Sequence, residues 1–158
     1  RTTDIFGELD LLFKHGIEHV DPATIAGTFK GRKAIYNHMM SMISNAKEFV
    51  TIATTEQGLI RKAGELKSEL KRAKNNKVGV KIVAPANSKE AKEAAKELQD
   101  VAVVKNVDPK ARFVIVDNKE VLMILNDETH ESSEIAIWTR TPFFASALNS
   151  MLEQSIRK

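Results

Sequence analysis

Apolar residues recur along this chain with two periods, one typical of helices and one typical of strands. Helical spacing predicts helices in residues 3–15, 35–46, 59–76, 87–98 and 142–152. Short apolar runs predict strands in residues 23–29, 48–54, 78–84, 101–105, 111–117, 121–126 and 134–139. Helices alternate with strands in the first half, which predicts parallel strands, whereas residues 111–126 predict an antiparallel hairpin around Asn118 and Lys119. The pattern favours an α/β fold with a mixed, mostly parallel sheet and helices on both faces.

The composition is that of one domain. The chain has 158 residues, of which 42% are hydrophobic, enough for a single buried core. It has no cysteine, which excludes disulfides and suits a reducing cytoplasm, where we expect the protein to act. His15 and His19 have a ligand-like spacing, but Gly16 between them marks a helix end, so we expect no metal and no cofactor. No apolar run reaches about 18 residues, so we expect no membrane segment.

Residues Lys110 to Asp117 have the spacing of a phosphodiesterase motif. It is the His-x-Lys-x-x-x-x-Asp of the phospholipase D superfamily, in which a strand presents a nucleophilic histidine and a phosphate-binding lysine. Lys110 stands at the histidine position, Arg112 at the lysine position and Asp117 at the aspartate position. A lysine ammonium has no lone pair at neutral pH, so Lys110 cannot attack phosphorus. The alternative interpretation is an ordinary strand with solvated charges at its ends.

The strand geometry suggests a second use for these residues. Lys110 and Arg112 are two positions apart, so on a strand both would project from one side and bind a phosphate or a carboxylate. Asp117 is an odd number of residues from Arg112 and would face the other way unless the strand bends. The pair therefore predicts an anion site without a nucleophile or a general base.

Three further segments resemble the TrmB-like archaeal transcription regulators. They are residues 117–125, residues 135–139 with Trp138, and the Phe143–Phe144 pair that opens the closing helix. The resemblance runs from about residue 20 to the end of the chain. It implies one half of the phospholipase D fold, serving as an effector-sensing or dimerisation domain. In that family a winged-helix DNA-binding domain comes first, and because this chain starts with Arg1 rather than Met we expect that domain to lie outside it.

We accordingly divide the chain in two. Residues 1–20 are expected to be a linker or dimerisation helix, and residues 21–158 a phospholipase D-like α/β domain. Ile5, Leu9 and Leu12 form an apolar stripe on an N-terminal helix that has too few turns to be stable alone. The stripe predicts a homodimer.

The departures from the active enzymes indicate a non-catalytic domain. Those enzymes continue from the aspartate to a Gly-Ser-x-Asn segment, whereas residues 123–127 are bulky and mostly apolar here. Two alternatives remain open. One is a phospholipase D-like phosphodiesterase or nuclease, for which His130 is the nearest histidine, and the other is a domain that binds nucleic acid directly.

A basic segment motivates the second alternative. Residues 61–77 contain seven Lys or Arg against two Glu, a local charge of +5 compared with +3 for the whole chain. Such a stripe would meet DNA phosphates. The competing interpretation is a solvated helix face, stabilised by charge pairs three and four residues apart.

Trp138, Thr139 and Arg140 complete the set of candidate ligand-binding residues. They lie at the end of a predicted strand, directly before a helix whose N-terminal amides favour an anion. With Lys110, Arg112 and Asp117 they predict a site for a small anionic or sugar-like effector. For Trp138 the alternative is an ordinary place in the core.

Overall fold

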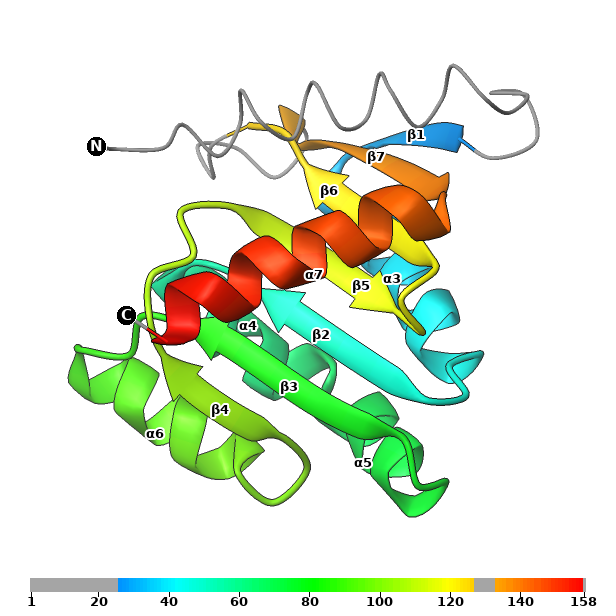
Figure 1. Cartoon of the computed structure of the whole chain (residues 1–158). Helices are drawn as coiled ribbons and strands as arrows, with labels where there is room; N and C mark the ends of the chain where they lie inside the picture. The colour runs from blue at the N-terminus through cyan, green and yellow to red at the C-terminus, as the bar shows by residue number, and fades with distance from the viewer. Residues whose placement is uncertain (1–25, 127–132, 158) are drawn as a thin grey trace.

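A computed structural model describes residues 26–126 and 133–157 of the chain (Figure 1). The N-terminal helix predicted with Ile5, Leu9 and Leu12, and the proposed linker of residues 1–20, lie outside the described residues. The described elements are β1 (Ala26–Lys30), α3 (Arg32–Ser44), β2 (Phe49–Ala53), α4 (Glu56–Glu65), α5 (Lys67–Asn75), β3 (Gly79–Ala84), α6 (Lys89–Leu98), β4 (Val103–Asn106), β5 (Arg112–Val116), β6 (Glu120–Ile124), β7 (Ile135–Arg140) and α7 (Pro142–Arg157).

The seven strands form one mixed sheet in the order β1-β7-β6-β5-β2-β3-β4. The first-half prediction is confirmed, because β2 pairs with β3 and β3 with β4 in parallel. The remaining four pairings are antiparallel, so the prediction of a mostly parallel sheet was wrong in its proportion. Two of the four follow from the connections, because β5, β6 and β7 follow one another through segments too short for a crossover, and short connections force antiparallel pairing. The β1–β7 and β2–β5 pairs join strands that are distant in the sequence, so their direction could not be inferred from the length of a connection.

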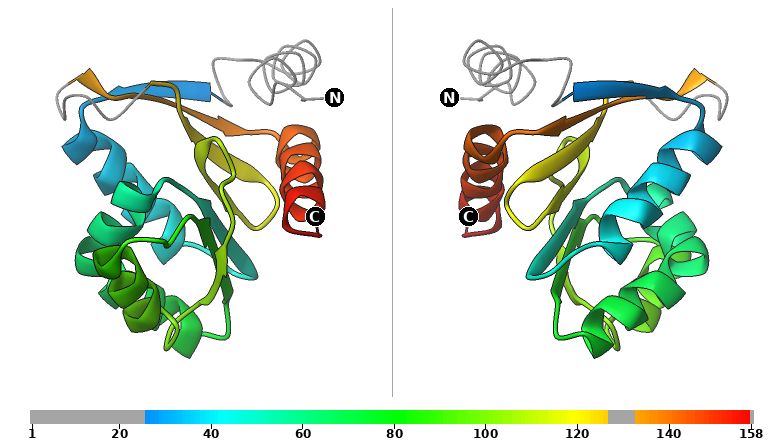
Figure 2. Two further views of the ribbon diagram at one scale, coloured as in Figure 1. Left: turned by 90° about the vertical axis from the view of Figure 1, so that its left-hand side faces the viewer. Right: turned by 90° about the vertical axis from the view of Figure 1, so that its right-hand side faces the viewer.

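Helices cover the two faces of the sheet unequally. On one face α3, α4, α5 and α6 pack against alternate residues of the strands in the larger apolar core. On the other face, within the described residues, α7 packs through Phe144, Leu148 and Leu152 onto β5 and β6. Figure 2 shows this arrangement for the described elements, with α7 on one side of the sheet and α3, α4, α5 and α6 on the opposite side. Helices on both faces were predicted, and this is confirmed.

The helix predicted for residues 59–76 is bent rather than straight. It divides at Leu66 into α4 and α5, although the Leu66 amide still bonds to the Lys62 carbonyl at 2.9 Å. Leu66 is fully buried. Periodicity alone gives one continuous helix here, because apolar positions keep their spacing through the bend.

The β5–β6 turn contains Asp117, the last residue of the motif. Asp117 and Asn118 have φ values of 55° and 56°, in the left-handed region that Asp and Asn tolerate better than other residues with a Cβ. The Asp117 carboxylate accepts the backbone amides of Glu48 at 2.7 Å, Lys47 at 2.9 Å and Phe49 at 3.0 Å. Asp117 therefore holds the start of β2 against the end of β5.

These hydrogen bonds also determine the acidity of Asp117. Burial raises the pKa of its carboxyl, but the bonds from the three amides, assisted by the charge of Lys119, outweigh burial and leave the pKa below its ordinary value. A carboxylate with a lowered folded-state pKa stabilises the fold above its unfolded pKa. That stabilisation is lost as the pH falls through the folded value.

We predict that Asp117→Asn lowers the free energy of unfolding by about 2 kcal/mol at pH 7, because an amide cannot satisfy three donors as a carboxylate does. The difference from the unsubstituted chain should shrink as the pH falls from about 5 to about 2. Urea denaturation across this pH range measures both effects.

Asp108→Asn is the matched control. The exposed Asp108 accepts the single amide of Lys110 at 2.9 Å, so its replacement should cost less than about 1 kcal/mol. Equal stability of the two variants at pH 7 would contradict the anchoring role of Asp117.

Candidate functional site

Arg112, at the phosphate-binding position of the motif, lies in a buried ion-pair cluster. Its Nη2 donates to Oε2 of Glu134 at 2.8 Å, and its Nη1 donates to the carbonyl of Asn126 at 3.3 Å. Arg32, at the start of α3, donates to the two oxygens of the same carboxylate at 3.2 and 3.1 Å. The Glu134 side chain has no exposed surface. The cluster joins α3 and β5 to the residue before β7.

The charges of this cluster explain why Glu134 stays ionised. Burial raises the pKa of Glu134, but the hydrogen bonds and charges of Arg32 and Arg112 outweigh burial and hold it below its ordinary value. In addition, the Arg112 Nε is buried and has no hydrogen-bond partner in the described part of the chain.

Lys110 does not share the surroundings of Arg112. It lies before β5, is exposed, and has a φ of 57°, so the alternation of a strand does not extend back to it. Asp117 follows the opposite end of β5, about 16 Å from Arg112 at the usual rise of about 3.3 Å per residue. The structure therefore does not bring the three motif residues together.

Trp138 belongs to an aromatic cluster between β7 and α3. Its Nε1 donates to Glu120 at 2.9 Å, and its ring meets the edge of His38 at a centroid distance of 5.5 Å. His38 stacks on Phe29 at 4.4 Å. Burial lowers the pKa of His38, an effect that Glu120 partly opposes, so the imidazole is neutral at pH 7. Its Nε2 is buried without a described partner and does not face an open site.

The neighbours of Trp138 point in different directions. Thr139 is buried, and its hydroxyl lies 2.6 Å from that of Thr141. Arg140 is exposed and lies over the Trp138 ring, with its guanidinium carbon 5.8 Å from the ring centroid. Trp138 packs against the larger core, in agreement with the alternative considered for it.

One residue of the predicted basic segment faces the interior. Lys62 is 2% exposed, and its Nζ donates to the Tyr36 hydroxyl at 3.2 Å and to Thr54 Oγ1 at 3.4 Å. Gly58 makes this packing possible, because a Cβ there would lie 2.0 Å from Thr54 Oγ1. Lys62 is therefore not available to DNA, and the basic surface is smaller than the sequence indicated.

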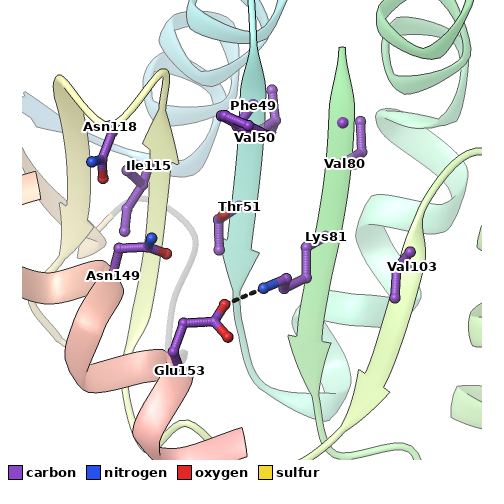
Figure 3. A pocket seen from close by; sticks show the side chains of 11 residues that line it. Phe49, Val50, Thr51, Val80, Lys81, Val103, Ile115, Asn118, Asn149 and Glu153 are labelled. Carbon is purple, nitrogen blue, oxygen red and sulfur yellow. Dashed lines mark hydrogen bonds and ion pairs between the residues drawn. The ribbon is translucent and has the colours of Figure 1, made fainter. Parts of the chain in front are cut away.

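A pocket of about 420 Å³ lies on the face of the sheet that carries α7 (Figure 3). Phe49 and Thr51 of β2, Lys81 of β3 and Val103 of β4 line one side of it, and α7 contributes Asn149 and Glu153. Lys81 and Glu153 form an ion pair that connects the sheet to the helix, drawn as a dashed line in Figure 3. The pocket occupies the part of the sheet beside α7 that the helix does not cover.

The sequence predictions missed this pocket, although the strands carried a signal. A strand covered on both faces is apolar at every position. Here two central strands break that rule on one face, at Thr51 in β2 and at Gly79 and Lys81 in β3. Those positions share one face, which marks it as partly uncovered.

No group of three His, Asp or Glu side chains in residues 26–126 and 133–157 is arranged to hold a metal ion. Over the same ranges, none of the helices has the length and apolar character needed to cross a membrane.

Structural comparison places the fold among phospholipase D-like proteins. A phospholipase D family member, Nuc from Salmonella typhimurium, matches with a TM-score of 0.65 and 17% identity over 82% of this chain and 93% of that one. Phosphatidylserine synthase from Haemophilus influenzae Rd KW20 matches with a TM-score of 0.60 and 13% identity over 84% of this chain and 38% of that one. These likenesses confirm the predicted half of a phospholipase D fold.

An archaeal chromatin protein shares the same fold. TrmBL2, described as an archaeal chromatin protein with a novel mode of DNA binding, matches with a TM-score of 0.64 and 16% identity over 94% of this chain. The chain spans 58% of the length of TrmBL2. No curated protein sequence matches the chain.

Sequence comparison with protein families agrees with the resemblance seen in residues 117–144. The family model described as "Transcriptional regulator TrmB, EBD N-terminal subdomain" matches residues 26–152. That match includes all the described strands and most of α7. The chain therefore belongs to the TrmB family of transcriptional regulators.

Proposed function

We propose that this chain is a non-catalytic effector-sensing and dimerisation domain of an archaeal DNA-binding transcription regulator that acts in the cytoplasm. The observation that carries the proposal is the position of Arg112. Where the phospholipase D motif has a lysine for phosphate, Arg112 is buried and paired with Glu134 at 2.8 Å. Lys110, at the nucleophile position, is an exposed ammonium with no lone pair to donate.

The DNA contact is proposed for a winged-helix domain of the full-length regulator outside this chain. TrmBL2, which has the same fold, is described as binding DNA, and this chain spans 58% of it. Homodimers are the commonest oligomers, and a symmetric regulator suits paired half-sites on DNA. The apolar stripe of Ile5, Leu9 and Leu12 supports a homodimer.

The anion site expected at Lys110, Arg112, Asp117, Trp138, Thr139 and Arg140 stays a prediction. The two guanidinium groups that meet at Glu134 support weak anion binding near Arg112. The full set does not converge on one site, because Asp117 is committed to backbone amides and Thr139 is buried. We therefore restrict the anion proposal to Lys110 and Arg112, with the exposed Lys110 ammonium as the contact and the buried, Glu134-paired Arg112 contributing positive charge two residues away.

We predict that the chain does not accelerate hydrolysis of bis(p-nitrophenyl) phosphate above the buffer rate, because it lacks a nucleophile beside Arg112. Phosphate, sugar phosphates and organic acids should raise the melting temperature slightly, and Lys110→Ala should remove that shift. An absorbance assay and a melting series measure the two effects. Turnover that Lys110→Ala abolishes would refute the non-catalytic assignment, and an unchanged melting temperature in every anion would refute the anion site.

We predict that the chain sediments with twice its mass of 17.6 kDa, and that removing residues 1–15 yields a monomer. A short apolar helix gains stability by packing on a partner. Sedimentation velocity over a range of concentrations measures the mass. A strictly monomeric chain at high micromolar concentration, with stability unchanged by the deletion, would exclude this dimer.

The alternative of direct nucleic-acid binding rests on the lysines around α5, of which Lys71 and Lys77 are exposed and Lys67 is half-buried. We predict that the chain binds duplex DNA weakly, without sequence preference, and less as salt increases. Replacing Lys67, Lys71 and Lys77 with Gln should lower the steepness of the salt dependence by up to about one unit per lost phosphate contact. Fluorescence anisotropy at several salt concentrations measures it.

The matched control replaces Lys89, Lys92 and Lys96 of α6 with Gln. This variant loses the same charge from a helix that also carries glutamates. If both variants lose binding equally, the effect comes from net charge rather than from α5. Tight, sequence-selective binding by the unsubstituted chain would instead establish direct DNA recognition as its function.

A further inference from the structure

We propose that the pocket between α7 and β2–β4 binds a small zwitterion with an apolar side chain, of the α-amino-acid class. This inference names an effector class for the sensing role proposed above and rests on that role. Its starting point is the pair of opposite charges on the two sides of the pocket, Lys81 on the sheet and Glu153 on the helix.

The Lys81–Glu153 pair can open to admit a ligand. The two side chains are 31% and 36% exposed, and ion pairs with that much solvent contact contribute little to stability. A zwitterion replaces both partners at once, since its carboxylate accepts from Lys81 and its ammonium donates to Glu153. A ligand with a single charge satisfies one of them and leaves the other unpaired in a partly desolvated site.

Two neutral polar groups are available beside these charges. The Thr51 hydroxyl and the Asn149 amide have no hydrogen-bond partner among the described residues, although Thr51 is 8% exposed in the middle of the sheet. Figure 3 shows them on opposite walls, near the Lys81–Glu153 pair. An ammonium group has three donors, so a Glu153 oxygen, the Thr51 hydroxyl and the Asn149 carbonyl can all accept from it.

The rest of the pocket is apolar. Phe49 and Val103 are 60% and 55% exposed, unusually high for large apolar residues on neighbouring parts of one sheet face, and Ile115 forms part of the floor. These three side chains would cover the apolar side chain of the ligand. The pocket volume of about 420 Å³ is within the range of about 300–1,000 Å³ typical of small-molecule sites.

A ligand held at this place would contact both the sheet and α7. Asn149 and Glu153 are one helical turn apart on α7, while Leu148 and Leu152 of the same helix pack on β5 and β6. Replacing the Lys81–Glu153 pair by a bridging ligand therefore alters how α7 is tied to β3. Ligand binding in the pocket would thereby change the attachment of α7 to the sheet, and through α7 it can affect the rest of the regulator.

The experiment is isothermal titration calorimetry of the full chain with leucine, methionine and phenylalanine. Two matched analogues each remove one charge from leucine: 4-methylpentanoate lacks the ammonium, and 3-methylbutylamine lacks the carboxylate. We expect leucine to bind, and each of its two singly charged analogues to bind at least tenfold more weakly. Equal binding of amino acid and analogue, or binding of glucose or maltose in place of every amino acid, would overturn the ligand class.

Substitutions locate the site. Glu153→Gln and Lys81→Met should each weaken binding at least tenfold, and Thr51→Val should weaken it by a smaller factor. Glu69→Gln is the control, since it removes a carboxylate from another partly exposed ion pair, with Arg72 at 3.6 Å, on α5 at the other face of the sheet. Thermal denaturation of each variant without ligand confirms folding. Unchanged affinity in both Glu153→Gln and Lys81→Met would show that the ligand binds elsewhere.

Sedimentation separates the two proposals. No binding of any zwitterion to a chain that still dimerises would remove the pocket inference and leave the proposed function standing. Binding that changes neither the dimer nor the DNA affinity of the full-length regulator would remove the sensing role while leaving a ligand site.

Discussion

The apolar faces of a sheet are stable only where other elements cover them, and this chain covers its two faces very differently. Four helices lie on one face, whereas the described residues place only α7 on the other. Helix α7 packs in one apolar cluster with β5, β6 and the ends of β2 and β3 at Ala53 and Val83, so the earlier parts of β2 and β3 keep an open surface on that side. The residues there reflect this, because Thr51, Gly79 and Lys81 occupy positions that would be large and apolar beneath a helix. The pocket follows from that uneven cover.

A second constraint is the buried carboxylate of Glu134. A carboxylate without exposed surface has to be matched by charge and hydrogen bonds, and Arg32 and Arg112 supply both. The pairing joins the start of α3 to β5 and to the residue before β7, which are far apart in sequence. Arg112, at the phosphate-binding position of the phospholipase D motif, therefore has a structural role here: through Glu134 it connects β5 to α3 and β7. The same holds for Asp117, whose oxygens accept backbone amides of the β2 segment.

Most of the helices and strands could be predicted from the sequence because each is marked by the residues within it. Strand runs such as Phe113–Val116 are apolar on both faces, helices keep the spacing of three and four, and left-handed φ at Asp117 and Asn118 fits a hairpin turn. The predictions that failed concern pairing between segments that are distant in the sequence. The direction in which two strands pair depends on their places in the sheet, and β5 lies beside β2 and runs antiparallel to it. The bend at Leu66 also left the apolar spacing intact and so gave no signal.

The candidate site was less predictable. The sequence by itself determined the family resemblance, the missing nucleophile at Lys110 and the approximate elements, because these depend on residue type and short-range spacing. Only the tertiary structure decided that Arg112 pairs with Glu134, that Lys62 points inward, and that Thr51, Lys81, Asn149 and Glu153 line one pocket. The physical reason is that burial and charge pairing arise between segments tens of residues apart, such as Lys81 and Glu153. The spacing of apolar residues along the chain indicates on which face of a helix or strand a side chain lies, but it does not indicate which side chains of other elements it contacts.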